Sequence, residues 1–256
     1  MNIKHYLKRI NYTGDLSLNL EVLKNLQQSH LLYVPFENLD IQYGNTIDLD
    51  LDKIYSKVVE QGRGGFCYEL NGLFNELLRE LGFNSKMISA RVYDSKNQKF
   101  GEEFDHLAII VKLNNVEYLV DVGFGEFAFH PLKMELNKTQ SDPRGDFIIE
   151  EHKNGYYQVS KMEGETKLVE YIFTKKKRDL MEFTEMCRYH QTSPKLHFTQ
   201  KRLISKPTQN GRITISGNML KVTDNGGIIK ELTFDNQNFS ELLLNWFGIE
   251  ESVLIG

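Results

Sequence analysis

The chain has 256 residues, 40% of them hydrophobic and 26% charged, with a formal net charge of -4; this composition is typical of a globular protein with a sizeable core, and it argues against a general nucleic-acid binder, whose surface is basic. Its two cysteines, Cys67 and Cys187, are too few for a disulfide framework or a four-cysteine zinc site. Because no apolar run approaches the roughly 20 residues of a membrane span and charges interrupt the N-terminal segment, we expect a soluble, cytoplasmic protein without a signal peptide.

The first third of the chain is predicted to be helical around a glycine-rich turn. Leucines near a 3.6-residue period predict a helix over residues 16–26, and a proline keeps residues 33–40 extended. Apolar residues on one face predict a second helix over residues 68–81, with Gly82 as its C-terminal cap. The turn over residues 61–67 runs directly into this helix. Its last residue therefore lies at a helix N-terminus.

From about residue 85 the sequence is typical of β-structure. Strands are predicted over residues 87–93, 106–113, 116–122, 146–150, 156–161 and 168–173. A helix over residues 179–189, short strands over 212–216, 219–222 and 228–232, and an amphipathic helix over 239–247 follow. This order predicts an α+β fold with a helical domain (1–84), a β domain (85–185) and a linking segment with an α/β part (186–256).

Cys67 is the first candidate for chemistry. The N–H groups at a helix N-terminus favour a thiolate and can serve as an oxyanion hole, and the two preceding glycines let the backbone approach a reacting carbon. The alternative is a buried cysteine that packs as a small apolar residue. The glycine turn, Gly64-Gly65, favours the nucleophile.

A base for Cys67 is predicted from a hairpin register. Asn114-Asn115 is a good two-residue turn, so Ala108 is expected opposite Asp121, with His106 diagonal to Asp121 on the same face. The carboxylate would then fix the tautomer of the imidazole and stabilise its protonated form. Cysteine, histidine and aspartate in this chain order are typical of a thiol triad.

The other reactive residue types carry weaker signals. Cys187 and the remaining histidines have no partner in the sequence and are interpreted as structural or exposed, with His197 the main exception. The basic run 175–178 is interpreted as a solvated segment. The pair Gly123 and Gly125 does not complete a dinucleotide fingerprint, and no spacing typical of a metal site occurs.

Several segments together resemble the arylamine N-acetyltransferases, in particular the bacterial type. The segment Arg63-Gly64-Gly65-Phe66-Cys67-Tyr68-Glu69-Leu70-Asn71-Gly72-Leu73-Phe74 is similar to their active-site signature. Four further segments match in order, over roughly residues 1 to 205: Val34-Pro35-Phe36-Glu37-Asn38-Leu39, Asp105-His106-Leu107-Ala108, Asp121-Val122-Gly123-Phe124-Gly125 and Gln191-Thr192-Ser193-Pro194 with Phe198-Thr199.

The resemblance implies a papain-like Cys67–His106–Asp121 core within three lobes: an N-terminal helical bundle, a central β-barrel-like domain and a C-terminal α/β lid. It implies ping-pong transfer of an acetyl group from acetyl-coenzyme A, through a Cys67 thioester, to an arylamine, arylhydrazine or N-hydroxyarylamine. It also implies the following roles: Phe36, Val92 and Phe124 in the aryl pocket, Thr199 and Ser205 as coenzyme A contacts, and Arg63 paired with Glu37 to brace the turn.

One segment departs from the family pattern, and two other activities use the same residues. Residues 102–105 carry three carboxylates just before His106, which predicts repulsion of a coenzyme pyrophosphate. A thiol hydrolase or transglutaminase-like transferase would use the same triad without coenzyme A, and an amide synthase would take its acyl group from a carrier protein. A non-enzymatic binding module is disfavoured because all three triad residues are present.

Overall fold

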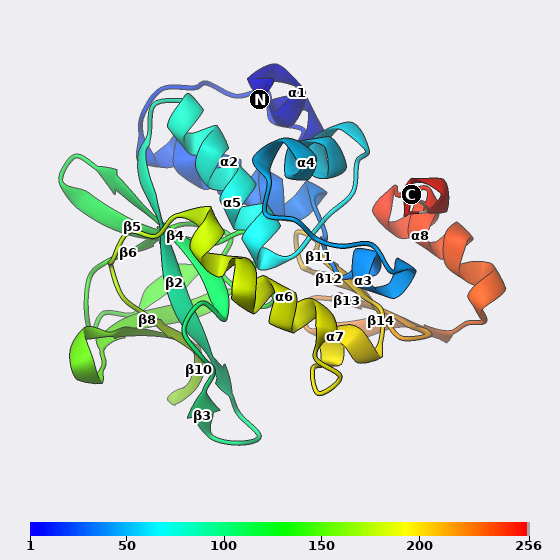
Figure 1. Cartoon of the computed structure of the whole chain (residues 1–256). Coiled ribbons are helices and arrows are strands. Elements are labelled where there is room, and N and C mark those ends of the chain that lie inside the picture. Colours follow the sequence, from blue (N-terminus) through cyan, green and yellow to red (C-terminus); the bar gives the residue numbers. More distant parts are fainter. Residues whose placement is uncertain (255–256) are drawn as a thin grey trace.

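The computed structural model describes residues 1–254 and has the α+β composition expected from the sequence (Figure 1). Its α-helices are α1 (Ile3–Arg9), α2 (Leu20–Tyr33), α3 (Leu39–Tyr43), α4 (Leu51–Tyr55), α5 (Cys67–Glu80), α6 (Thr184–Thr192), α7 (His197–Gln200) and α8 (Phe239–Phe247). A π-helical turn, Ser56–Glu60, continues α4. None of the helices within the described residues is both long and apolar enough to cross a membrane.

The strands form two antiparallel sheets. The larger has the order β6-β5-β4-β2-β10-β9-β8-β7, with β3 paired to β2, and the smaller has the order β1-β11-β12-β13-β14. The larger sheet contains β2 (Asn84–Asp94), β3 (Lys99–Phe100), β4 (His106–Leu113), β5 (Val116–Val120), β6 (Leu132–Lys133), β7 (Gln140–Asp142), β8 (Gly145–Glu151), β9 (Tyr157–Glu163) and β10 (Thr166–Phe173). The smaller contains β1 (Phe36–Glu37), β11 (Leu203–Pro207), β12 (Gly211–Ser216), β13 (Met219–Asp224) and β14 (Gly227–Thr233).

Helix α5 carries the predicted nucleophile and is central to the structure. It begins at Cys67, and Phe66 is its N-cap. Its apolar face is buried in a core with α1, α2 and one face of the larger sheet. Gly82 follows it with φ +96°, a left-handed conformation that glycine adopts without strain. The second predicted helix is therefore confirmed, one residue earlier at each end.

The first predicted helix is wrong in its bounds. Residues 16–19 precede the helix, and Leu16 and Leu18 are exposed. The helix begins at Leu20 because the side chain of Asn19 accepts a hydrogen bond from the N–H of Val22 (2.9 Å), which makes Asn19 the N-cap. The spacing of the leucines predicted a helix that starts at residue 16, but the N-cap Asn19 makes it start at Leu20.

The β4–β5 hairpin has the predicted register. Leu113 lies opposite Val116, and the pairing continues to Ile109 and Val120. Asn114 and Asn115 have φ values of 47° and 65°, as a two-residue hairpin turn of this hand requires. The register places His106 on the same face as the residue that follows β5, which is Asp121.

The larger sheet is nearly closed, like a β-barrel. Its two ends, β6 and β7, are joined by Gln140, whose side chain accepts from the N–H of Lys133 (2.7 Å) and donates to its carbonyl (2.9 Å). A second apolar core, which includes Phe147 and Phe173, lies within this sheet. Its other face covers α5, as Figure 1 shows for the neighbouring β2 and β4.

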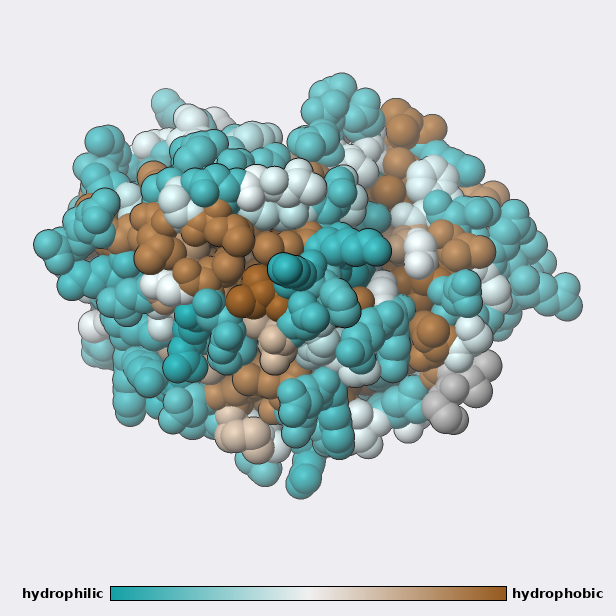
Figure 2. All heavy atoms as spheres, turned by 90° about the horizontal axis from the view of Figure 1, so that it is seen from above, coloured by the Kyte–Doolittle hydropathy of each residue, from teal (hydrophilic) through white to brown (hydrophobic). Residues whose placement is uncertain are grey.

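The smaller sheet pairs one strand from the first third of the chain with four strands from its last quarter. β1 pairs with β11, with Phe36 opposite Ser205, and α8 packs on the sheet through a third apolar core. Because β1 comes from the N-terminal third, this pairing brings an early segment beside a late one (Figure 1). Seen from above, the surface is mainly hydrophilic, with apolar side chains in patches (Figure 2).

Candidate active site

Cys67 lies at the N-terminus of α5, half-buried, where the glycine turn meets the helix. The turn packs closely on β1, since a Cβ on Gly64 would lie 2.0 Å from the carbonyl oxygen of Pro35. On its other side, a Cβ on Gly123 would lie 2.6 Å from Cys67 Cα. Two glycines therefore let three backbone segments converge around the thiol.

His106 and Asp121 form a buried pair beside Cys67. The Nε2 atom of His106 lies 2.6 Å from Oδ2 of Asp121, and both side chains are at most 3% exposed. Burial alone lowers the pKa of His106, but the Asp121 carboxylate and the Cys67 thiolate outweigh it and raise the pKa to about 10. Because Nε2 is bonded to Asp121, Nδ1 is the ring nitrogen left for Cys67. This arrangement favours the imidazolium form of His106.

Two residues that the sequence analysis did not select hold Asp121. Asn71 Nδ2 donates to Asp121 Oδ1 (2.9 Å) and to the carbonyl of Leu107 (2.7 Å), while its Oδ1 accepts from the N–H of Val122 (2.9 Å). The hydroxyl of Tyr171 donates to Asp121 Oδ2 (3.1 Å). Asn71 had a detectable signal, because it is a polar residue one turn after Cys67 on a helix whose surrounding residues are buried.

Aromatic side chains surround this group. The ring of Phe124 lies 5.1 Å from the His106 ring, edge to face, and the ring of Phe36 lies 5.7 Å from that of Phe66. Phe198, which was not selected, lies 4.8 Å from the Phe66 ring and 5.9 Å from the Phe36 ring. Phe36, Phe124 and Phe198 are all half-buried.

Arg63 pairs with Glu37 and so braces the glycine turn, as the resemblance implied. Its guanidinium donates to Glu37 (2.9 Å) and to Asp40 (2.5 Å), and the three side chains are at most 9% exposed. Burial lowers the pKa of Arg63, but the two carboxylates outweigh it and raise it. The glycine turn is thus fixed to β1 and α3 by charge-assisted hydrogen bonds.

The whole chain resembles known proteins, in sequence and in structure. A sequence model of the N-acetyltransferase family matches residues 19–253. The chain is 31% identical to arylamine N-acetyltransferase 1 of Homo sapiens, over 97% of this chain and 94% of that one. The chain belongs to the arylamine N-acetyltransferase family. It is also 34% identical to the pineal gland isozyme NAT-3 of Gallus gallus, over 82% of this chain and 79% of that one.

Solved structures of the family share the fold. The arylamine N-acetyltransferase of M. tuberculosis superposes with a TM-score of 0.91 at 29% identity, covering 99% of this chain and 96% of that one. The Mycobacterium marinum enzyme, solved in complex with CoA, superposes with a TM-score of 0.89 at 26% identity, covering 99% and 94%. Members of this family are acyltransferases.

Val92 lies at the edge of this aromatic group. It sits opposite Tyr171 in the β2–β10 pairing and is half-buried. Its N–H donates to Asp105 Oδ2 (3.3 Å). Val92 therefore adjoins the residues that hold Asp121, while its role in an aryl pocket stays a prediction.

Thr199 and Ser205 lie on the α7 and β11 side of the same region. The hydroxyl of Thr199 lies 2.8 Å from the carbonyl oxygen of Ser193 and 2.9 Å from that of Leu196, in the segment between α6 and α7, and its single proton is shared between them. Ser205 Oγ lies 2.8 Å from the Thr214 hydroxyl and accepts from Arg212 (2.9 Å). Ser205 lies opposite Phe36 in the β1–β11 pairing, and the role of both residues as coenzyme A contacts stays a prediction.

The acidic segment before His106 is largely paired. Glu103 accepts from Arg178 (3.1 Å), and Asp105 Oδ1 lies 3.0 Å from His190 Nε2. Only Glu102 of the three carboxylates is exposed. Arg178 therefore pairs with one carboxylate of this segment, a contact that the sequence did not show, and the effect of the segment on a pyrophosphate stays a prediction.

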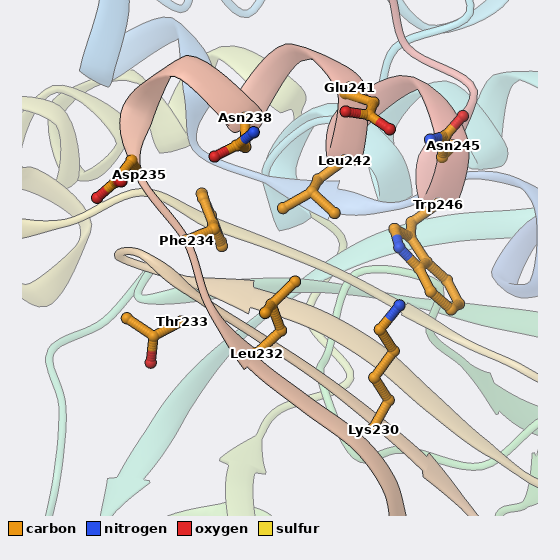
Figure 3. A pocket seen from close by; sticks show the side chains of 10 residues that line it. All are labelled: Lys230, Leu232, Thr233, Phe234, Asp235, Asn238, Glu241, Leu242, Asn245 and Trp246. Atoms are coloured by element: carbon orange, nitrogen blue, oxygen red, sulfur yellow. The ribbon is translucent and has the colours of Figure 1, made fainter.

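Two cavities lie outside this group. One, of about 660 Å³, lies between β14 and α8, where Lys230 Nζ sits 5.1 Å from the Trp246 ring centroid (Figure 3). The other, of about 820 Å³, is lined by residues 46–51 and by α6, including Cys187. Neither is lined by the Cys67 group. Cys187 is buried, as expected for a structural residue, and burial raises its pKa to about 12.

Proposed function

We propose that the chain transfers an acetyl group from acetyl-coenzyme A to an arylamine or arylhydrazine through a thioester on Cys67, and to the oxygen of N-hydroxyarylamines. The observation that carries this proposal is the placement of His106 between Asp121 and the Cys67 thiol. Membership of the family supports the reaction class.

In the first half-reaction Cys67 is the nucleophile. Acetyl-coenzyme A supplies an acyl group already activated as a thioester. The Cys67 thiolate attacks the acetyl carbonyl carbon, while N–H groups of the first turn of α5 stabilise the negative oxygen. His106 gives its proton to the departing sulfur of the coenzyme, and Asp121 keeps the ring oriented.

In the second half-reaction the acetyl group leaves Cys67. The nitrogen of the acceptor attacks the thioester carbon, and neutral His106 takes a proton from it. The Cys67 thiolate departs, which restores the imidazolium–thiolate pair. Phe36, Phe124 and Val92 would contact the aryl ring, and Phe198 extends this apolar surface.

The residues near Cys67 fit coenzyme A in part. Ser205, Thr214 and Arg212 place two hydroxyls and a guanidinium on one face of the smaller sheet, opposite α8. Such donors suit phosphate or pantetheine oxygens, but Arg212 Nε already donates to Glu126 Oε1 (2.7 Å), so a ligand would compete with that carboxylate. The Thr199 hydroxyl is already bonded within its turn, so its contribution would be through its backbone or shape.

The three-lobe layout belongs to the same proposal. A helical lobe (1–84) would carry Cys67, a β lobe (85–185) would carry His106 and Asp121, and the rest (186–256) would cover the site as a lid. The second apolar core lies within the β lobe and the third mainly within the last lobe, whereas the first core is shared between the helical lobe and one face of the larger sheet. The boundary at 185 falls within α6, whose buried side chains join the first core.

Intact-protein mass spectrometry tests the proposal. The native chain, mixed with acetyl-coenzyme A alone, should gain one acetyl group and lose it when an arylamine or hydrazine is added. Cys67→Ser should gain none, whereas Cys187→Ser should behave like the native chain. No adduct, with the donor either ignored or hydrolysed, would favour a thiol hydrolase or an amide synthase that uses a carrier protein.

A further inference from the structure

A buried group of charged side chains lies directly beneath the glycine turn and the N-terminus of α5. It contains two cations and three carboxylates: Lys57, Arg63, Glu37, Asp40 and Glu69. Each side chain is at most 10% exposed. Three carboxylates against two cations leave one excess negative charge in a medium where charge is weakly screened.

Lys57 is the centre of this group. Its Nζ lies 2.6 Å from Asp40 Oδ2 and 2.8 Å from Glu69 Oε1. Its backbone carbonyl accepts from the N–H of Arg63 (3.1 Å). Lys57 therefore contacts the glycine turn through its backbone, and its ammonium group reaches the turn a second time through Glu69. Lys57 lies in the π-helical turn Ser56–Glu60, a rare conformation that recurs at functional sites.

Glu69 connects Lys57 to Cys67. It lies two residues after Cys67, and its Oε2 accepts from the N–H of Phe66 (2.8 Å), the residue just before the thiol. Burial raises the pKa of Glu69, and the Lys57 ammonium opposes that change. A Cβ on Gly65 would lie 2.7 Å from Glu69 Oε2, so the carboxylate also fills the inside of the turn.

The charges that face Glu69 come from several elements. Asp40 from α3 adds a negative charge, and Lys57 supplies the nearest positive one. The Cys187 thiol from α6 also faces it, but its pKa of about 12 keeps it neutral. Burial lowers the pKa of Lys57, whereas Glu69, Glu37 and Asp40 outweigh burial and raise it, so the ammonium stays charged.

We propose that Lys57 is a positioning residue for Cys67: it holds Glu69 on the N–H of Phe66 and offsets negative charge that would otherwise oppose a thiolate at the start of α5. This inference rests on the proposed nucleophilic role of Cys67. Without Lys57, three buried carboxylates would face Arg63 alone, and the thiolate would form at higher pH.

The test is the rate at which iodoacetamide alkylates Cys67, measured by peptide mass spectrometry from pH 5 to 10. The native chain is compared with Lys57→Met, Glu69→Gln and the double variant, with thermal unfolding of each as a check of folding. We expect Lys57→Met to move the midpoint up by about one pH unit and Glu69→Gln to move it down. The double variant should return close to the native midpoint, because both charges are gone.

The outcomes separate this inference from the proposed function. An unreactive Cys67 in the native chain would overturn both. A reactive Cys67 whose midpoint is the same in all four proteins would overturn the role of Lys57 alone, and so would a double variant that shifts as far as Lys57→Met. If Lys57→Met does not fold, Glu69→Gln decides, since an unshifted midpoint there contradicts the inference.

Discussion

Gly123 lies so close to Cys67 that a Cβ at Gly123 would be 2.6 Å from Cys67 Cα and 2.9 Å from Cys67 Cβ. The N–H of Gly123 donates to Asp121 Oδ1 (2.9 Å). The loop after β5 therefore contacts the backbone of Cys67 and also donates a hydrogen bond to the carboxylate of Asp121. A contact this short leaves no room for a side chain, and the fold depends on glycine there.

The first prediction is that Gly123→Ala separates the loop from α5. The added methyl group must displace Cys67, Asn71 or the loop itself, so we expect alkylation of Cys67 and acetyl transfer to fall at least about 100-fold. The matched control is Gly125→Ala, where an added Cβ meets nothing within 4 Å. Equal activity in the two variants would show that the contact does not constrain the site.

The second prediction concerns Asp121→Asn. Removing the carboxylate removes the main charge that raises the pKa of His106, so the imidazolium would be lost at lower pH. We expect alkylation of Cys67 near pH 7 to slow by about 100-fold or more, with the protein still folded. Tyr171→Phe, which removes only one donor to the same carboxylate, should have a much smaller effect. An unchanged alkylation rate in Asp121→Asn would show that Asp121 does not orient His106.

Local features could be predicted from the sequence because their causes are local. The register that brings His106 to Asp121 follows from the two asparagines of the hairpin turn and their left-handed φ values. The position of Cys67 at a helix N-terminus follows from the glycines before it and the apolar period after it. Neither inference required knowledge of a distant segment.

Contacts between distant segments could not be predicted in this way. β1 has two residues, and its partner β11 is more than 160 residues away, so no local sequence pattern predicts the pairing. Tyr171 reaches Asp121 from β10, next to a bulge between Val169 and Tyr171 that changes which residues share a face. Lys57 lies in a π-helical turn, for which the helical period gives no signal.

The third prediction concerns the stability supplied by Arg63. Arg63→Met leaves Glu37, which is fully buried, and Asp40 short of one cation. Breaking a buried ion pair from one side costs about 3–5 kcal/mol, and we expect that loss in the free energy of unfolding by urea. Arg79→Met is the control, since Arg79 is 63% exposed and its pair with Glu76 is 3.5 Å long. That change should cost less than about 0.5 kcal/mol. Similar losses in both variants would contradict a special role for the buried group.

The fourth prediction is an acid-sensitive core at His30. This side chain is fully buried among the rings of Tyr6 and Phe74, and neither ring nitrogen has a hydrogen-bond partner among residues 1–254. Burial, helped by the charge of Arg9, lowers the pKa of His30 from 6.5 to about 3. Below pH 6.5, His30 therefore binds a proton in the unfolded chain, whereas in the folded protein it does so only near pH 3.

The sign follows from this difference. Because the unfolded state binds more protons, stability falls as pH decreases from 6.5 toward 3, by about 1.4 kcal/mol per pH unit from this group. His30→Leu should remove that contribution, and His5→Gln, at an exposed position on α1, should not. Urea unfolding of the three proteins at pH 7.0, 6.0 and 5.0 measures the difference above the range where most carboxylates titrate. The free-energy gap between native and His30→Leu should move in favour of the variant as pH falls. A gap that stays constant over this range would mean that the folded protein accepts the proton on His30.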